Sequence, residues 1–167
     1  MEALLAFSQK SGIYDFMHSA WGWPIIESLH FIGLSLLIGT VGLFDLRMMG
    51  LGRGIPLQAL HKLVPWGVAG YALNVTTGLM FVTSVPDQYL FNPAFQTKLA
   101  LMGIAGLNIL VFYRFVFVPV KASSADADTP RAAKVVAAVS FCCWVGVIIC
   151  GRLITYYRPP YYWCFWC

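Results

Sequence analysis

Four long apolar segments set the strongest limit on how this chain of 167 residues can fold. They cover approximately residues 24–46, 65–85, 98–118 and 134–156. Each can cross a hydrocarbon core of about 30 Å as a helix that rises about 1.5 Å per residue. Hydrocarbon offers backbone groups no hydrogen-bond partner, so a spanning segment has to be helical. The sequence therefore predicts an all-α protein, a bundle of four transmembrane helices that forms one integral membrane domain over residues 1–167.

The amino-acid composition favours the same class of protein. Hydrophobic residues make up 59% of the chain and charged residues 11%, whereas a soluble domain has roughly 25% charged residues. The net charge of +4 does not predict a nucleic-acid interface, because no basic patch is interleaved with aromatic residues on a soluble surface. The lipid bilayer is therefore an expected partner, and nucleic acid is not.

The residues before the first apolar segment predict a short interfacial helix, with Trp21 and Trp23 at the level of the lipid headgroups. The topology follows from the basic residues. Seven lie in or beside the connections at 46–63 and 114–134, and four lie at the opposite ends of the segments. Basic residues favour the cytoplasmic side, so we expect both connections inside and both termini outside.

Charged side chains inside the first and last segments are the first candidates for a site, because an ionisable group in a membrane is costly. Glu27 and His30 lie about 60° apart on a helical wheel, and Asp45 returns to the same face. Arg152 in the fourth segment is expected at nearly the depth of Glu27. We therefore predict a structural ion pair between Glu27 and Arg152.

Other small and polar residues predict contacts between helices. Asn74 and Asn108 lie at similar depths in the second and third segments, where interhelical amide hydrogen bonds are expected. The first segment also carries a face of small residues that would allow another helix to approach closely: Ser28, Ser35, Gly39 and Gly42.

The pattern of histidines and cysteines leaves the question of a cofactor open. His30 is expected either to make a structural hydrogen bond or to bind haem b, with Arg152 or Lys98 on a propionate. Cys164 and Cys167 form a terminal C-x-x-C, a candidate disulfide or redox pair. The sequence contains no P-loop, GxGxxG, HExxH or Ser–His–Asp arrangement, so we expect no catalytic residues and no metal site.

A series of motifs begins with S-x-W-x-W-P-x-x-E-x-x-H-x-x-G at 19–33 and ends with G-R-L-I-x-Y at 151–156. Together these motifs resemble a bacterial family of small four-helix membrane proteins of unknown function. The resemblance implies a location in the bacterial inner membrane. A more distant likeness is to haem-associated four-helix proteins, including membrane-embedded protoporphyrinogen oxidase and copper-resistance D-type proteins. These share a histidine in the first helix and a lysine that opens the third, here His30 and Lys98; their late third-helix histidine is Tyr113 in this chain.

Three functions are consistent with these residues. The first expectation is a non-catalytic membrane subunit that anchors or serves a larger, possibly redox, envelope complex with other membrane or periplasmic subunits. The alternative is a b-haem or quinone-linked electron-transfer protein that uses His30. A third reading, less favoured, is a small transporter or channel lined by Glu27, His30 and Asp45.

Overall fold

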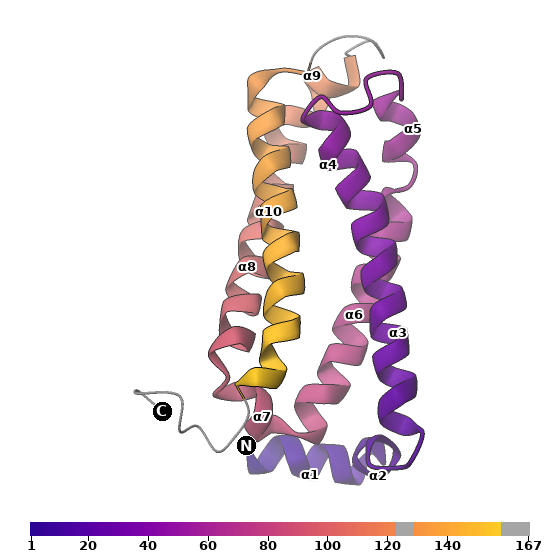
Figure 1. Ribbon diagram of the computed structural model, residues 1–167, viewed down its shortest axis with the longest axis vertical. Helices are drawn as coiled ribbons and strands as arrows, with labels where there is room; N and C mark the ends of the chain where they lie inside the picture. The colour runs from indigo at the N-terminus through magenta and orange to yellow at the C-terminus, as the bar shows by residue number, and fades with distance from the viewer. Residues whose placement is uncertain (123–128, 158–167) are drawn as a thin grey trace.

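The computed structural model describes residues 1–122 and 129–157, and in this part of the chain every regular element is a helix. Long helical columns run side by side, while α1 (Glu2–Lys10) and α2 (Ile13–Met17) lie across one end (Figure 1). The prediction of an all-α protein is confirmed. The columns consist of α3 (Gly22–Leu37), η1 (Ile38–Gly42) and α4 (Leu43–Met48); α5 (Leu57–His61) and α6 (Val64–Ser84); α7 (Pro86–Leu90), α8 (Pro93–Val111), η2 (Phe112–Val116) and α9 (Phe117–Ala122); and α10 (Arg131–Leu153) and η3 (Ile154–Tyr156).

Three helical stretches in the described part of the chain are long and apolar enough to cross a membrane: Gly22–Met48, Pro93–Val116 and Arg131–Tyr156. The column formed by α6 is also long, at 21 residues, but it is less apolar because it carries several hydroxyl groups and an amide. Thr76, Thr83 and Ser84 turn their hydroxyls back onto backbone carbonyls of α6, at 2.7–2.9 Å. Its polar side chains are therefore largely satisfied within the helix itself.

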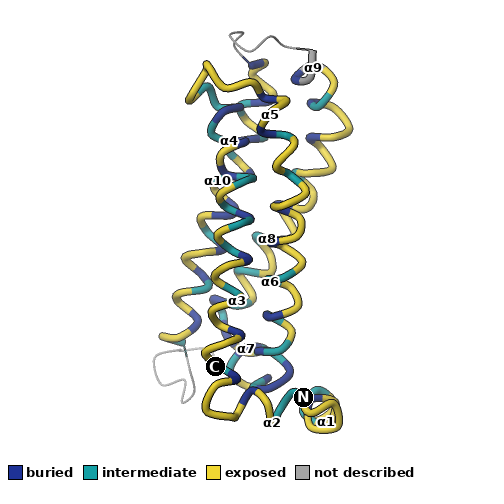
Figure 2. The backbone as a smooth tube through the Cα atoms, turned by 90° about the vertical axis from the view of Figure 1, so that its right-hand side faces the viewer, coloured by how far each residue is buried: buried dark blue, intermediate teal, exposed yellow. Residues whose placement is uncertain are grey.

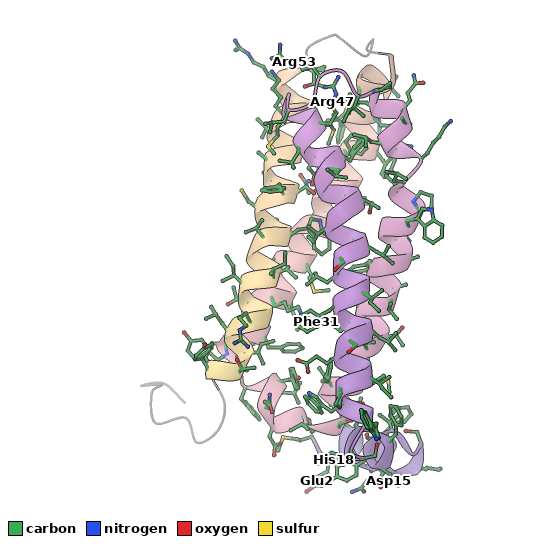
Figure 3. The ribbon with its side chains drawn as sticks, turned by 45° about the vertical axis from the view of Figure 1, so that its right-hand side comes forward. Glu2, Asp15, His18, Phe31, Arg47 and Arg53 are labelled. Atoms are coloured by element: carbon green, nitrogen blue, oxygen red, sulfur yellow. The ribbon has the colours of Figure 1, made fainter. Side chains whose placement is uncertain are left out.

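The distribution of charge along the bundle matches a membrane orientation of the helices. Glu2, Asp15 and His18 lie at one end and Arg47 and Arg53 at the other (Figure 3). Between the ends, large apolar side chains face outward, and exposed residues follow the outer side of every column (Figure 2). A soluble protein rarely exposes an apolar surface of this extent.

The columns pack as two pairs, α3 with α6 and α8 with α10, and the pairs are joined where α10 packs against α4. Glycines allow the first pair to approach closely. A Cβ atom on Gly70 would lie 2.5 Å from the carbonyl oxygen of Gly33, and one on Gly33 would lie 2.8 Å from the carbonyl oxygen of Gly70. The two backbones are therefore in direct contact, which larger residues would prevent.

This contact corrects the small-residue face that the sequence predicts for the first segment. A Cβ atom on Gly39 would meet nothing within 4 Å, and Ser28 and Ser35 are exposed. The face that packs is marked by Gly33, with Gly67 and Gly70 on α6. The reason is that the wheel shows which small residues share a face, but does not show which face meets the neighbouring helix.

Asn92 fixes the end of the bundle opposite α4, and it is fully buried. Its side-chain oxygen accepts hydrogen bonds from the backbone N–H groups of Ala94 and Phe95, as an N-cap does. Its amide nitrogen donates to the carbonyl oxygens of Ile154 and Tyr157, at 3.0 and 2.9 Å. One side chain thus starts α8 and ties it to the end of the α10 column. Because of this cap, α8 begins at Pro93, before the predicted boundary at residue 98.

We expect Gly70→Ala to destabilise the protein by about 1–3 kcal/mol, because the new methyl group would overlap the backbone of α3. Gly103→Ala in α8 is the matched control, since a Cβ atom there would meet nothing within 4 Å. It should stabilise slightly or have no effect, because alanine favours a helix by up to about 1 kcal/mol over glycine. Denaturant unfolding in detergent micelles measures both, and equal stability of the two variants would contradict the close contact.

Candidate functional site

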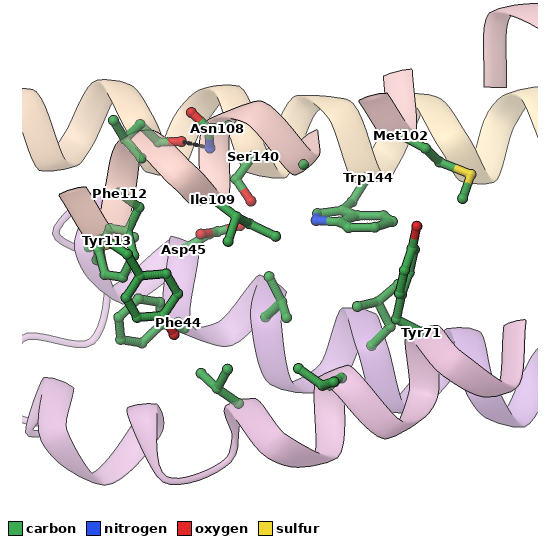
Figure 4. A pocket seen from close by; sticks show the side chains of 18 residues that line it. Phe44, Asp45, Tyr71, Met102, Asn108, Ile109, Phe112, Tyr113, Ser140 and Trp144 are labelled. Atoms are coloured by element: carbon green, nitrogen blue, oxygen red, sulfur yellow. Dashed lines mark hydrogen bonds between the residues drawn. The ribbon is translucent and has the colours of Figure 1, made fainter. Parts of the chain in front are cut away.

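A cavity of about 240 Å³ lies inside the bundle, among the four long columns. Its walls are mostly apolar, and aromatic side chains from several helices surround it (Figure 4). A few polar groups also face this space: those of Asp45, Tyr71, Asn108, Ser140 and Trp144. An apolar cavity with a small number of converging polar groups is the usual form of a site for a small molecule.

Asp45 is the acidic residue of this cavity. It belongs to α4, and only 3% of its surface is exposed. The Ser140 side chain of α10 lies beside its carboxyl group (Figure 4). One carboxyl oxygen, Oδ2, is buried without a hydrogen-bond partner among the described residues. A buried carboxyl oxygen that lacks a partner is costly, so Asp45 has an unused bonding capacity next to the cavity.

Trp144 contributes a second unused polar atom to the same cavity. It lies on α10, one helical turn after Ser140, and only 5% of its surface is exposed. Its indole Nε1–H can only donate a hydrogen bond, and no acceptor reaches it in the described part of the chain. Tyr71 of α6 lies edge-on to the indole, with the ring centroids 6.0 Å apart.

Two π-helical turns flank the cavity. η1 separates α3 from α4, and η2 separates α8 from α9; Val41 of η1 and Phe112 of η2 both line the space. Such turns are rare and occur frequently at functional sites.

The η1 turn also corrects the helical face predicted for the first segment: Asp45 is buried, but Glu27 is exposed. Residues in a π-turn advance less around the axis than in an α-helix, so Asp45 leaves the face of Glu27.

An adjoining hollow marks the side on which the cavity meets the surface. It shares Val64, Val68 and Tyr113 with the cavity and continues to His61 and Lys62. The hydroxyl of Tyr113 and Nε2 of His61 lie 3.3 Å apart, which links α5 to η2 across this hollow.

His30 lies in a separate place, against α6. Its Nδ1 is 2.7 Å from the Thr77 hydroxyl. The same hydroxyl lies 2.8 Å from the carbonyl oxygen of Leu73. A carbonyl oxygen can only accept, so the hydroxyl gives its one proton to Leu73 and accepts from His30. His30 therefore donates through Nδ1–H, and the lone pair of Nε2 remains available. The structural hydrogen bond expected for His30 is present, with Thr77 as its partner.

Lys98 lies near His30, whereas Arg152 does not meet Glu27. The Lys98 ammonium acts electrostatically on the His30 ring and on Cys150 of α10. Glu27 and Arg152 are both exposed. The Arg152 guanidinium lies over the Tyr156 ring, 5.9 Å from its centroid. In the part of the chain that the structure describes, the predicted ion pair is therefore absent. The reason is that α3 packs on α6, and α10 packs on α8 and α4.

The two asparagines do not bond to each other. Asn108 donates from Nδ2 to the carbonyl oxygen of Val136 on α10, at 2.9 Å (Figure 4). Asn74 donates to the carbonyl oxygen of Gly70 in its own helix, at 3.1 Å. Asn108 thus joins two helices, while Asn74 fills the space next to Gly33.

The predicted cysteine pair, Cys164 and Cys167, lies outside the described residues. Cys142, Cys143 and Cys150 are free thiols. No group of three or more His, Cys, Asp or Glu side chains in the described segments could hold a metal ion.

Trp144, Ser140 and Tyr71 are site residues that the sequence pattern did not predict. One signal could have found the first of these. Tryptophan in membrane proteins is enriched at the interface with water, and Trp144 lies in the middle of a long apolar segment. A mid-segment tryptophan that follows Ser140 by one turn marks an inward polar stripe on α10.

The family model described as "Family of unknown function (DUF6644)" matches residues 9–157, and this range contains the entire cavity and the His30 site. No curated protein and no solved structure matches the chain. The more distant likeness to haem-associated proteins therefore stays a prediction.

We expect Thr77→Val to destabilise the protein by about 1–3 kcal/mol, because it leaves the Nδ1–H group of His30 unpaired inside the bundle. Thr76→Val is the matched control: Thr76 is exposed and its hydroxyl bonds only within α6. Unfolding in detergent micelles compares the two. If both variants lose the same stability, the hydrogen bond between His30 and Thr77 has no role in holding α3 to α6.

Proposed function

This chain belongs to DUF6644, a family of unknown function, and we propose that it is a membrane protein that holds a small lipophilic molecule inside its helix bundle. The observation that carries the proposal is the cavity with two unpaired buried polar atoms, Asp45 Oδ2 and Trp144 Nε1. Apolar walls favour a lipophilic molecule, and the two polar atoms would fix its orientation. Such a molecule would satisfy both atoms.

The proposal includes the arrangement of the chain in the membrane. We propose four spans, with α6 as the fourth, in the bacterial inner membrane and with both termini outside. Three points support α6: it has 21 residues, it packs along α3, and its hydroxyls bond to its own carbonyls. The basic residues Arg47 and Arg53, at the end with the α4–α5 connection, favour the cytoplasmic side for that end.

A protein that holds such a molecule without reacting with it can present it to another protein. In this sense we propose a non-catalytic subunit that serves a larger envelope complex. The cavity would be its contribution, and the partner would act on the bound molecule.

The proposal is tested by extracting the purified full-length protein with organic solvent and analysing the extract by mass spectrometry. We expect one lipophilic compound, beyond the bulk phospholipids, to be retained by the wild type and depleted in Trp144→Phe, which keeps the ring but loses the N–H donor. Trp66→Phe is the matched control, because Trp66 is 62% exposed on α6. Identical extracts from the wild type and both variants would contradict the proposal.

A second candidate function is favoured by the geometry of His30. Its Nδ1–H is held by Thr77, and a metal-bound histidine commonly donates its other N–H group in this way. The Nε2 lone pair could bind the iron of a haem b, and Lys98 or Arg152 could meet a propionate. Lys98 is the better placed, because it acts on the His30 ring, whereas Arg152 is exposed. Bound haem would supply one-electron transfer.

An absorbance spectrum of protein purified from haem-supplemented cells tests this second function. If His30 binds haem, the reduced protein shows a Soret and an α-band that are lost in His30→Ala. The control is His18→Ala. His18 lies at the end of α2, before α3 begins, and its ring stacks on Tyr14. A colourless wild-type preparation, or bands that persist in His30→Ala, would rule out haem at this histidine.

A further inference from the structure

We propose that the molecule held beside Asp45 and Trp144 is a quinone or its quinol, with two ring oxygens bound by these side chains. The inference rests on the proposed function, because it names the chemical class of the lipophilic ligand. It begins from two unpaired polar atoms that lie on different helices, α4 and α10, and face one cavity.

The two atoms limit what the ligand can be. The indole N–H of Trp144 only donates, so the ligand has to present an acceptor to it. The Asp45 carboxyl group accepts a hydrogen bond when it is ionised and donates one when it is protonated. One carbonyl oxygen of a quinone can accept from the Trp144 N–H group, and the other can accept from the O–H group of protonated Asp45. A quinol can donate one hydroxyl to the Asp45 carboxylate, while its second oxygen accepts from Trp144. Both redox forms therefore satisfy both side chains.

The walls of the cavity suit a flat ring. Phe44 and Phe112 meet edge to face, with their centroids 5.6 Å apart, and Tyr71 and Trp144 meet in the same way on the other side. Such aromatic groups pack favourably against a conjugated ring in stacked or edge-to-face geometry. The volume of about 240 Å³ is below the roughly 300–1,000 Å³ of sites that enclose a drug-sized ligand. It therefore holds the ring but not a long tail.

The apolar tail has a way out toward the lipid. The adjoining hollow shares Val64, Val68 and Tyr113 with the cavity. It lies between α6 and the α8–η2 column, which make few direct contacts with each other in the described part of the chain. The tail would leave over the two valines, and the ring would enter from the membrane by the same path.

A lipophilic cation is the main competitor, because a carboxylate surrounded by aromatic rings also suits an ammonium group. A simple alkylammonium has no hydrogen-bond acceptor, so it would leave the Trp144 N–H group unsatisfied. The unpaired indole N–H group therefore favours the quinone class over the cation.

The test uses full-length protein in phospholipid nanodiscs, titrated calorimetrically with decylubiquinone and, separately, with decyltrimethylammonium, against empty nanodiscs. We expect decylubiquinone to bind the wild type. Trp144→Phe should weaken the affinity for decylubiquinone about three- to tenfold, because one hydrogen bond is lost. Asp45→Leu should weaken this affinity by a similar or larger factor. Asp45→Asn should retain the affinity within about threefold, because an amide also donates and accepts. Trp66→Phe should bind as the wild type does.

The asparagine variant separates the two ligand classes, and it decides the question even if Asp45→Leu fails to fold. A cation would lose its affinity in Asp45→Asn, because the charge is gone. Unchanged decylubiquinone affinity in Trp144→Phe, or loss of it in Asp45→Asn, would overturn the inference. Binding of decyltrimethylammonium alone would also overturn it but leave the proposed cavity function intact. Binding of neither probe would overturn both.

Discussion

Hydrocarbon offers a polar side chain no hydrogen-bond partner, and this constraint explains how most polar residues of the bundle are placed. Hydroxyl groups on α6 bond back to its own carbonyls, and Asn92 uses both ends of its amide. Three buried polar side-chain atoms have no partner among the described residues. One is Ser8 Oγ in α1, and the other two, Asp45 Oδ2 and Trp144 Nε1, share one cavity. The cavity is therefore the place inside the bundle where buried polar atoms lack hydrogen-bond partners among the described residues.

Much of the fold follows from sequence because the same constraint acts on composition. Long apolar segments have to be helices, and the described helices coincide with the predicted segments to within a few residues at most ends. The largest difference is at α8. Its start depends on Asn92, whose amide reaches Ile154 far along the chain. The long-range hydrogen bonds that make Asn92 a helix start cannot be seen in the sequence.

The site was predicted less completely because a helical wheel assumes a uniform helix. The η1 turn breaks that assumption, so Asp45 is buried while Glu27 on the same predicted face is exposed. Depth alone also suggested that Glu27 and Arg152 meet, but depth does not determine which helices are neighbours. His30 was correctly expected to make a hydrogen bond, yet its partner Thr77 could be chosen only once α3 was known to pack on α6.

The cavity exists because α6 is held mainly from one side. The glycine contact fixes α6 against α3, and the central apolar cluster joins α3 to α8 and α10 through Leu37, Ala105 and Trp144. On the other side, aromatic contacts connect the columns: Tyr71 with Trp144, and His61 with Tyr113. One joins α6 to α10, and the other joins α5 to η2. Because these contacts are made by side chains and not by close backbones, the columns stay far enough apart on this side to leave the cavity between them.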